Sequence, residues 1–175
     1  MTPPIPALDR TDREIVALLQ KDARISNKEL ASKVHLAPSS CHGRVRRLEE
    51  LGVLRGSHAA VDPKALGVHL RCIVMVRLVD HAEKQTAQLQ GYLRELPEVC
   101  DLFLIAGHDD LLLHVAVRDT EHLRMLVMDA IGSRPEVADI HTSLIYEHAS
   151  RGGFPDLTDG PTEALRAAAE LGRAR

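Results

Sequence analysis

Residues 26–56 constrain the fold more than any other part of the chain, because they predict two short helices separated by a tight turn. Ser26 is followed three residues later by Glu29, a capping box that starts the first of these helices. Pro38 starts the second, at a position where its missing N–H costs nothing, and Gly52 ends it. After Gly52 a short β-type run over residues 53–61 predicts a hairpin or wing.

The second of these helices has one apolar and one basic side. Cys41, Val45 and Leu48 follow i, i+4, i+7 spacing and are expected to face the core. A supported helix with a basic outer side can lie in a DNA major groove. We expect contacts with double-stranded DNA from Ser26, Lys28, Pro38, Ser39, Ser40, His42, Gly43, Arg44, Arg46 and Arg47. A solvated face in which the arginines pair with Glu49 and Glu50 is the alternative.

An earlier helix is predicted from Asp9 to Lys21, with Asp9 as its N-cap and Asp12 in its first turn. Together these patterns predict a winged helix-turn-helix domain over residues 1–60 and a linker over residues 61–69.

The second half of the chain contains a weak internal repeat. Leu96-Pro97-Glu98-Val99 recurs as Pro135-Glu136-Val137, 38 residues later. Before each copy lies an apolar run and then an amphipathic helical pattern, and after each copy lies another strand-like run. Two such units predict a ferredoxin-like βαββαβ domain over residues 70–149, and the fold class is α+β. Residues 150–175 are expected to be a flexible tail with a short helix.

Apolar residues occur on both faces of two predicted strands, in residues 72–76 and 111–113. In a ferredoxin-like fold, helices cover only one face of the sheet. The other face then requires a second sheet from another subunit, so we expect at least a dimer.

Charge is distributed unevenly between the two halves. Residues 1–60 hold 10 Lys and Arg against 7 Asp and Glu, whereas residues 61–175 hold 12 against 18. A basic head on an acidic body fits a protein that offers one face to nucleic acid. Ordinary variation in surface charge is the alternative.

Other classes of protein find little support. No apolar run reaches the roughly 18 residues of a membrane span, and the first residues show no secretory signal. Three widely spaced cysteines suggest a reducing cytoplasm. The ten histidines and three cysteines show no metal-ligand spacing, and no nucleophile–base pair is evident. We therefore expect no cofactor, no metal and no enzymatic activity.

Three segments resemble the Lrp/AsnC (feast/famine) family of transcriptional regulators. Residues 8–24 match the family's first helix, residues 26–56 match its helix-turn-helix, and residues 107–113 resemble its Gly-Asp-x-Asp effector loop. The resemblance implies a body that binds amino acids and assembles into dimers and often octamers. Two departures concern the DNA-binding helix: Ala37 replaces the usual Ser N-cap, and Gly43 removes a side chain that would read a base.

The resemblance also implies an effector site near residues 107–110 and the last strand. The residues that we expect there are Gly107, His108, Asp109, Asp110, Thr142 and Ser143. Asp110 keeps its place in the family pattern and is the first candidate to bind an ammonium group; Asp109 is the second. His108 and Asp109 depart from the pattern. An ordinary hairpin turn is the alternative, since Gly and Asp form turns whatever their function.

Together these features predict a sequence-specific DNA-binding transcriptional regulator whose oligomeric body senses an amino acid or related metabolite. An effector-independent architectural protein that wraps DNA is the alternative hypothesis.

Overall fold

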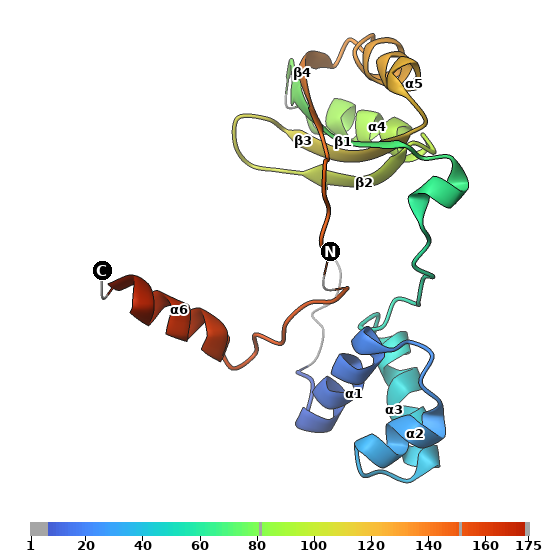
Figure 1. Ribbon diagram of the computed structural model, residues 1–175, viewed down its shortest axis with the longest axis vertical. Helices are drawn as coiled ribbons and strands as arrows, with labels where there is room; N and C mark the ends of the chain where they lie inside the picture. The colour runs from blue at the N-terminus through green and yellow to red at the C-terminus, as the bar shows by residue number, and fades with distance from the viewer. Residues whose placement is uncertain (1–6, 81, 151, 174–175) are drawn as a thin grey trace. The chain divides into compact units, whose positions relative to one another are not determined.

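The computed structural model describes residues 7–80, 82–150 and 152–173 (Figure 1). The chain forms two compact units. One comprises residues 1–59 and 149–175 and is called the head below; the other comprises residues 60–148 and is called the body. None of the helices in the described part of the chain combines the length and apolarity that a bilayer crossing requires.

Three helices build the N-terminal part of the head: α1 (Arg10–Lys21), α2 (Asn27–Lys33) and α3 (Pro38–Glu50). The predicted caps are confirmed for the first two. The side chain of Asp9 accepts a hydrogen bond from the Asp12 N–H at 2.8 Å, and that of Ser26 from the Glu29 N–H at 3.2 Å. Ala37 caps α3 without a side-chain hydrogen bond, so this helix depends on Pro38 and on packing for its start.

The three helices bury a small apolar core. Cys41 and Leu48 of α3 are fully buried and Val45 is partly buried against them, which confirms the predicted inner side of this helix. The other buried members of the cluster are Ile15, Leu30, Ala31 and Val34. Because the inner side of α3 is used up in this core, its polar side faces solvent.

The hairpin expected over residues 53–61 does not form, and the structure shows no strand there. The N–H groups of Val53 and Leu54 both donate to the carbonyl of Leu48, at 2.9 and 3.2 Å. These amides therefore close the end of α3 instead of pairing with a second strand. The chain continues as an exposed segment to a 3-10 turn, η1 (Pro63–Leu66).

The body is the predicted βαββαβ fold, in which every neighbouring strand pair is antiparallel and the strand order is β2-β3-β1-β4. Its strands are β1 (Leu70–Leu78), β2 (Val99–Leu104), β3 (Leu111–Val117) and β4 (Val137–Leu144). Its helices are α4 (Glu83–Arg94), α5 (Thr120–Arg124) and the π-helix η2 (Met125–Ile131). The ferredoxin-like α+β prediction is confirmed.

The helices pack on one face of this sheet (Figure 1). Leu89 and Leu93 of α4, together with Leu126 and Ile131 of η2, share one core cluster with alternate residues of β1 and β3. The residues between them in each strand project from the other face because side chains alternate along a strand. This second face, called the open face below, is not covered by any helix of the cluster.

The register identifies the residues of the open face. Phe103 lies opposite Leu112, Leu112 opposite Met75, and Met75 opposite His141. A parallel row runs through Asp101, His114, Ile73 and Ser143. Apolar and polar side chains are therefore mixed on a surface that a single subunit leaves uncovered.

The second helix of the body changes from α to π geometry at Met125. The Gly132 N–H donates to the carbonyl of Val127 at 2.8 Å, the i to i−5 bond of a π-helix. A Cβ at Gly132 would lie 3.0 Å from that carbonyl oxygen, so the position suits glycine.

Candidate DNA-binding and effector sites

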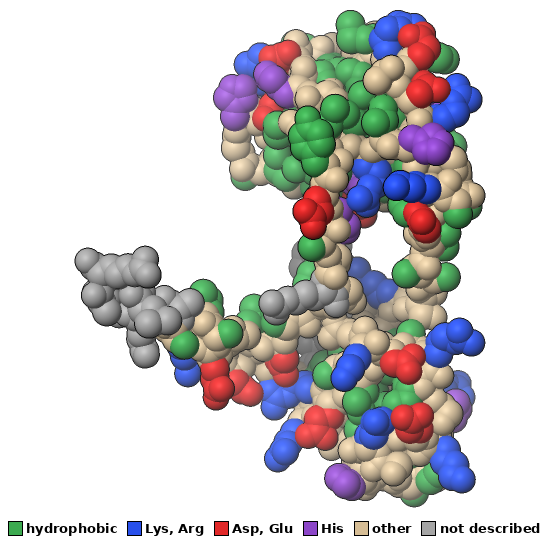
Figure 2. Space-filling model, in the orientation of Figure 1, with side chains coloured by type: hydrophobic (Ala, Val, Ile, Leu, Met, Phe, Trp, Pro, Cys, Tyr) green, Lys and Arg blue, Asp and Glu red, His purple; other side chains and the backbone are tan. Residues whose placement is uncertain are grey.

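The outer side of α3 is accessible along its length. Every residue predicted to contact DNA is exposed except Arg44, which is half-buried. No atom lies within 4 Å of the place where a Cβ of Gly43 would be, so this glycine leaves an opening on the exposed side. Figure 2 shows Lys and Arg interspersed with acidic side chains on the visible side of the head, rather than one continuous basic patch.

Two of the three predicted arginines are tied to α1. Arg44 donates to Asp9 and to Asp12, both at 2.7 Å, and Arg47 donates to the other oxygen of Asp12 at 3.0 Å. The Asp12 side chain is only 1% exposed. Hydrogen bonds to Asp9 and then Asp12 raise the pKa of Arg44, and the Asp12 N–H and Arg44 lower the pKa of Asp9. These contacts fix the position of α3 against α1.

Arg46 has a different environment. Among the described residues its ion-pair partner is Glu50, one turn away on the same helix at 2.9 Å, and the Arg46 side chain is 73% exposed. Exposed pairs of this kind contribute little free energy. A phosphate can therefore replace Glu50 at small cost, so the pairing of Arg46 with Glu50 does not oppose a DNA contact.

In the loop between β2 and β3, Asp110 is bonded to the scaffold of the body. Its Oδ2 accepts from the Leu78 N–H at 2.8 Å. Its own N–H donates to the Val76 carbonyl at 3.0 Å, and its carbonyl accepts from the Ile105 N–H at 2.9 Å. Asp110 thus ties the end of β1 to the loop between β2 and β3.

Asp109 lies next to it with a less satisfied carboxylate. Its side chain is 12% exposed, and among the described residues its Oδ1 has no hydrogen-bond partner. Two imidazoles approach this oxygen: the Nδ1 of His108 at 3.5 Å and that of His141 at 4.0 Å. A buried carboxylate oxygen without a hydrogen bond is costly, so this oxygen is suited to receive a donor.

The two predicted hydroxyls of β4 point to opposite faces of the sheet. Thr142 lies opposite the buried Val74, whereas Ser143 lies opposite Ile73 of the open face. His141 and Ser143 are therefore on one face and Thr142 on the other. Gly107, at φ +159°, has no atom within 4 Å of where its Cβ would be.

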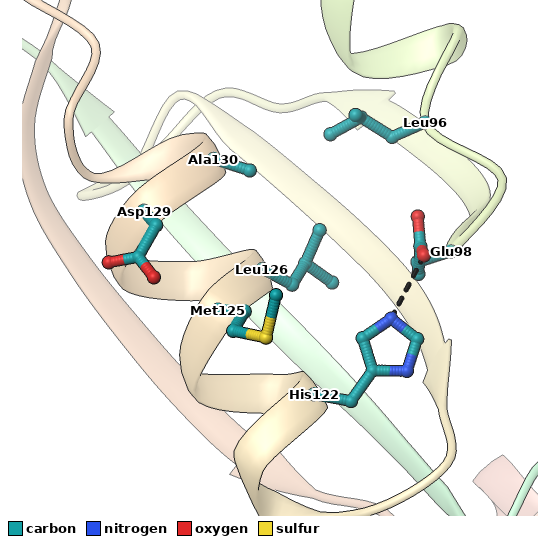
Figure 3. A pocket seen from close by; sticks show the side chains of 7 residues that line it. All are labelled: Leu96, Glu98, His122, Met125, Leu126, Asp129 and Ala130. Atoms are coloured by element: carbon teal, nitrogen blue, oxygen red, sulfur yellow. Dashed lines mark hydrogen bonds and ion pairs between the residues drawn. The ribbon is translucent and has the colours of Figure 1, made fainter.

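A cavity of about 390 Å³ on the helical side of the body was not predicted (Figure 3). Glu98, just before β2, and His122 of α5 point toward each other across it, with Oε1 and Nε2 2.9 Å apart. Leu96, Met125, Leu126, Asp129 and Ala130 complete its lining. The side chain of Asp119 caps α5 by accepting a hydrogen bond from the His122 N–H at 2.8 Å. Local spacing indicates that cap but not the partner of the imidazole.

Comparisons with known proteins agree with this arrangement. Residues 8–49 match the family model of the AsnC-type helix-turn-helix domain, and residues 71–153 match that of the Lrp/AsnC ligand binding domain. The HTH-type transcriptional regulator AldR of Mycolicibacterium smegmatis is 46% identical over 148 residues, covering 85% of this chain and 86% of that protein. The leucine-responsive regulatory protein of Escherichia coli K12 is 36% identical over 144 residues, covering 82% and 88%.

A solved structure is similar over nearly its whole length. The crystal structure of a transcriptional regulator from Neisseria meningitidis, in complex with L-Met, has a TM-score of 0.79 at 28% identity. The match covers 87% of this chain and 99% of that one.

The Asp12 contacts generate a stability prediction. Asp12→Ala removes the buried carboxylate shared by Arg44 and Arg47, and we expect it to lower the local stability of the α1–α3 packing by about 2 kcal/mol. Hydrogen exchange of α1 and α3 amides measures this loss. Glu14→Ala is the matched control, because the partner of Glu14 among the described residues is the exposed Arg10 on the surface of the same helix; we expect a loss of about 0.5 kcal/mol or less. Equal losses in the two variants would contradict the role given to Asp12.

Proposed function

The chain belongs to the Lrp/AsnC family of DNA-binding transcriptional regulators, and from this premise we propose that it controls transcription in the cytoplasm in response to an amino acid or related small metabolite. The observation that carries the proposal is the unsatisfied Oδ1 of Asp109, at a loop of the body that matches an Lrp/AsnC ligand binding domain. This match favours an effector over the effector-independent, DNA-wrapping alternative.

For the DNA contact we propose a division of labour on α3. Arg44 and Arg47 support the helix through Asp12, while Arg46, Ser39 and Ser40 face the nucleic acid. Arg46 is exposed, and a DNA group can replace its partner Glu50, so Arg46 suits a phosphate or guanine contact. Ser39 and Ser40 lie near the N-terminus of α3, where the helix dipole favours phosphate.

Arg46→Ala tests this assignment. We expect weaker binding to a duplex selected by the wild-type protein from a random library, measured by fluorescence anisotropy over a range of salt concentrations. If Arg46 holds a phosphate, the log–log salt slope falls by about one. Arg10→Ala removes the same charge from α1 and controls for the overall charge of the head. An Arg46 variant that binds as the Arg10 variant does would remove α3 from the proposed interface.

For the effector we propose that Asp109 receives the ammonium group. Asp109 and Asp110 both lie in the loop between β2 and β3. The Oδ2 of Asp110 already accepts the Leu78 N–H, whereas the Oδ1 of Asp109 lacks a hydrogen bond among the described residues. His141 and Ser143 of β4 both lie on the open face. His108 has a 72%-exposed side chain and can move away from Asp109 to admit a ligand. The L-Met complex of the Neisseria meningitidis regulator supports an amino acid as the effector class.

Asp109→Asn separates this role from a structural one. In a thermal-shift screen of the twenty amino acids followed by titration calorimetry, we expect the best ligand of the wild type to lose about 30- to 150-fold in affinity, since an ammonium without its charged partner costs about 2–3 kcal/mol. Asp139→Asn is the control, because Asp139 pairs with Arg77 in an exposed salt bridge. Affinity within about threefold of the wild type would move the ammonium site elsewhere.

For assembly we propose that two bodies meet through their open faces, giving at least a dimer and an octamer as the larger form. Leu112, Met75 and the 51%-exposed Phe103 form the apolar row that a second sheet would cover. Placing a charge in that row would leave it desolvated in the dimer.

Leu112→Asp is therefore expected to give a monomer at micromolar concentration by light scattering. Leu104→Asp provides the matched control: Leu104 is 63% exposed but lies opposite the buried Leu111, and so on the other side of the sheet. The control should keep the wild-type mass. A Leu112 variant that also keeps it would exclude the open face as the interface.

A further inference from the structure

The segment of residues 153–159, called the strap below, returns to the head after β4 and contacts α1. Its main chain is held by one side chain. Gln20 of α1 accepts from the Phe154 N–H at 2.7 Å and donates to the Phe154 carbonyl at 3.3 Å. Paired hydrogen bonds of this kind fix the strap in direction as well as position, because an amide side chain offers its donor and acceptor side by side.

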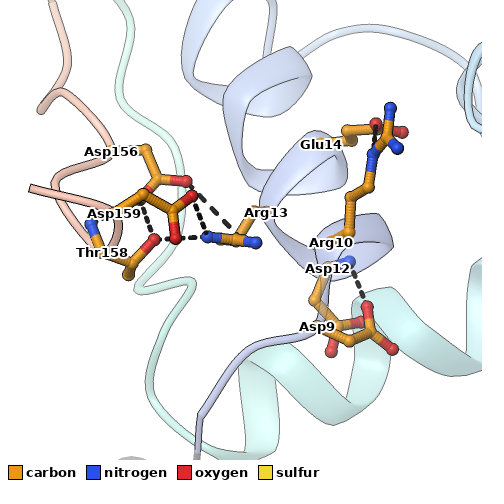
Figure 4. Close-up of polar contacts among 8 residues, drawn as sticks. All are labelled: Asp9, Arg10, Asp12, Arg13, Glu14, Asp156, Thr158 and Asp159. Carbon is orange, nitrogen blue, oxygen red and sulfur yellow. Dashed lines mark hydrogen bonds and ion pairs between the residues drawn. The ribbon is translucent and has the colours of Figure 1, made fainter. Parts of the chain in front are cut away.

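Arg13, which precedes Gln20 by about two turns of α1, provides a second point of attachment. Figure 4 shows it facing the strap residues Asp156, Thr158 and Asp159. Its guanidinium lies 3.1 Å from Asp159 and 3.7 Å from Asp156, and it donates to the hydroxyl of Thr158. The Arg13 side chain is only 26% exposed. The strap thus surrounds this cation with two carboxylates and a hydroxyl.

The strap is ordered internally in the shape that Arg13 requires. Both the N–H and the hydroxyl of Thr158 donate to the Oδ1 of Asp156, at 3.0 and 2.6 Å. These bonds lower the pKa of Asp156, and the charge of Arg13 acts in the same direction. Asp156 therefore uses its Oδ1 for the two bonds from Thr158 and keeps its Oδ2 for Arg13.

The surface used by the strap differs from the proposed DNA-binding surface. A cavity of about 880 Å³ is lined by α1, by the end of α3 with the residues after it, and by strap residues. None of the ten residues that we predicted to contact DNA lines this cavity. Strap and DNA can therefore occupy the head together.

We propose that residues 153–159 dock on α1 of the same chain and give the head a second attachment to the body. The first is the linker that precedes β1; the second is the connection from β4 to the strap. The matched family regions end at residue 153, before the residues that hold Arg13.

Charge reversal tests the docking without DNA or effector. In the full chain, Arg13→Glu should increase the deuterium uptake rate of the peptide spanning residues 152–160 by about tenfold, because the Phe154 N–H loses its protection when the strap leaves. Combining Arg13→Glu with Asp159→Arg, which keeps the Asp156–Thr158 hydrogen bonds, should restore most of the slow rate. Arg10→Glu, at an 87%-exposed side chain on the same helix, should change nothing. Equal uptake in the Arg13 variant and the wild type would overturn the proposal.

A designed disulfide shows which head the strap occupies. A Cβ at Gly153 would lie 3.3 Å from the Cβ of Gln20, close to the roughly 3.5–4.5 Å separation in disulfides. We expect Gln20→Cys with Gly153→Cys, in a Cys100→Ser background, to form an intrachain bond that migrates at monomer mass on a non-reducing gel. Lys21→Cys with Gly153→Cys should stay reduced. A covalent dimer would assign the strap to a second copy, and free thiols in the first pair would exclude docking; either result overturns the proposal.

Discussion

The body has helices on only one face of its sheet, and its other properties follow from that arrangement. The core needs Val74, Leu113 and their alternate neighbours on the helical face, so the residues between them must project from the open face. Met75 and Leu112 then form an apolar row that one layer of helices cannot cover, while His141 and Ser143 are placed at its edge. The same alternation thus leaves an apolar surface uncovered and places His141 of β4 4.0 Å from the Oδ1 of Asp109.

The head depends on a single buried carboxylate to orient its exposed helix. Asp12 is the buried charged residue of this small core, and its two oxygens receive Arg44 and Arg47 from α3. Its cost of desolvation is offset by two charge-assisted hydrogen bonds, which also prevent α3 from sliding along α1. Arg44 and Arg47 therefore contact Asp12 of α1, whereas Arg46 on the same helix remains exposed. The difference arises because α1 packs beside the first two and not beside Arg46.

Polar contacts recur wherever distant segments of the chain meet. Asp110 joins a loop to the end of β1, Glu98 meets His122 across a cavity, and Arg13 holds the strap. Apolar burial stabilises each unit internally, whereas these directional bonds determine how loops and the returning tail lie on it. Because most of them are partly exposed, ionic strength will weaken the strap sooner than either core.

Much of the fold was determined by the sequence alone, because it is encoded by interactions between near neighbours. The caps at Asp9 and Ser26 act over three residues, and strand alternation with the repeated Pro-Glu-Val places the βαββαβ order. Only the tertiary structure decided the rest. The hairpin was wrong because the amides after α3 bond back to Leu48, and Asp110 proved to be tied to Leu78. Arg13 meets Asp159 from the far end of the chain. Such contacts depend on how the helices, strands and loops pack in three dimensions, which residue spacing along the sequence does not indicate.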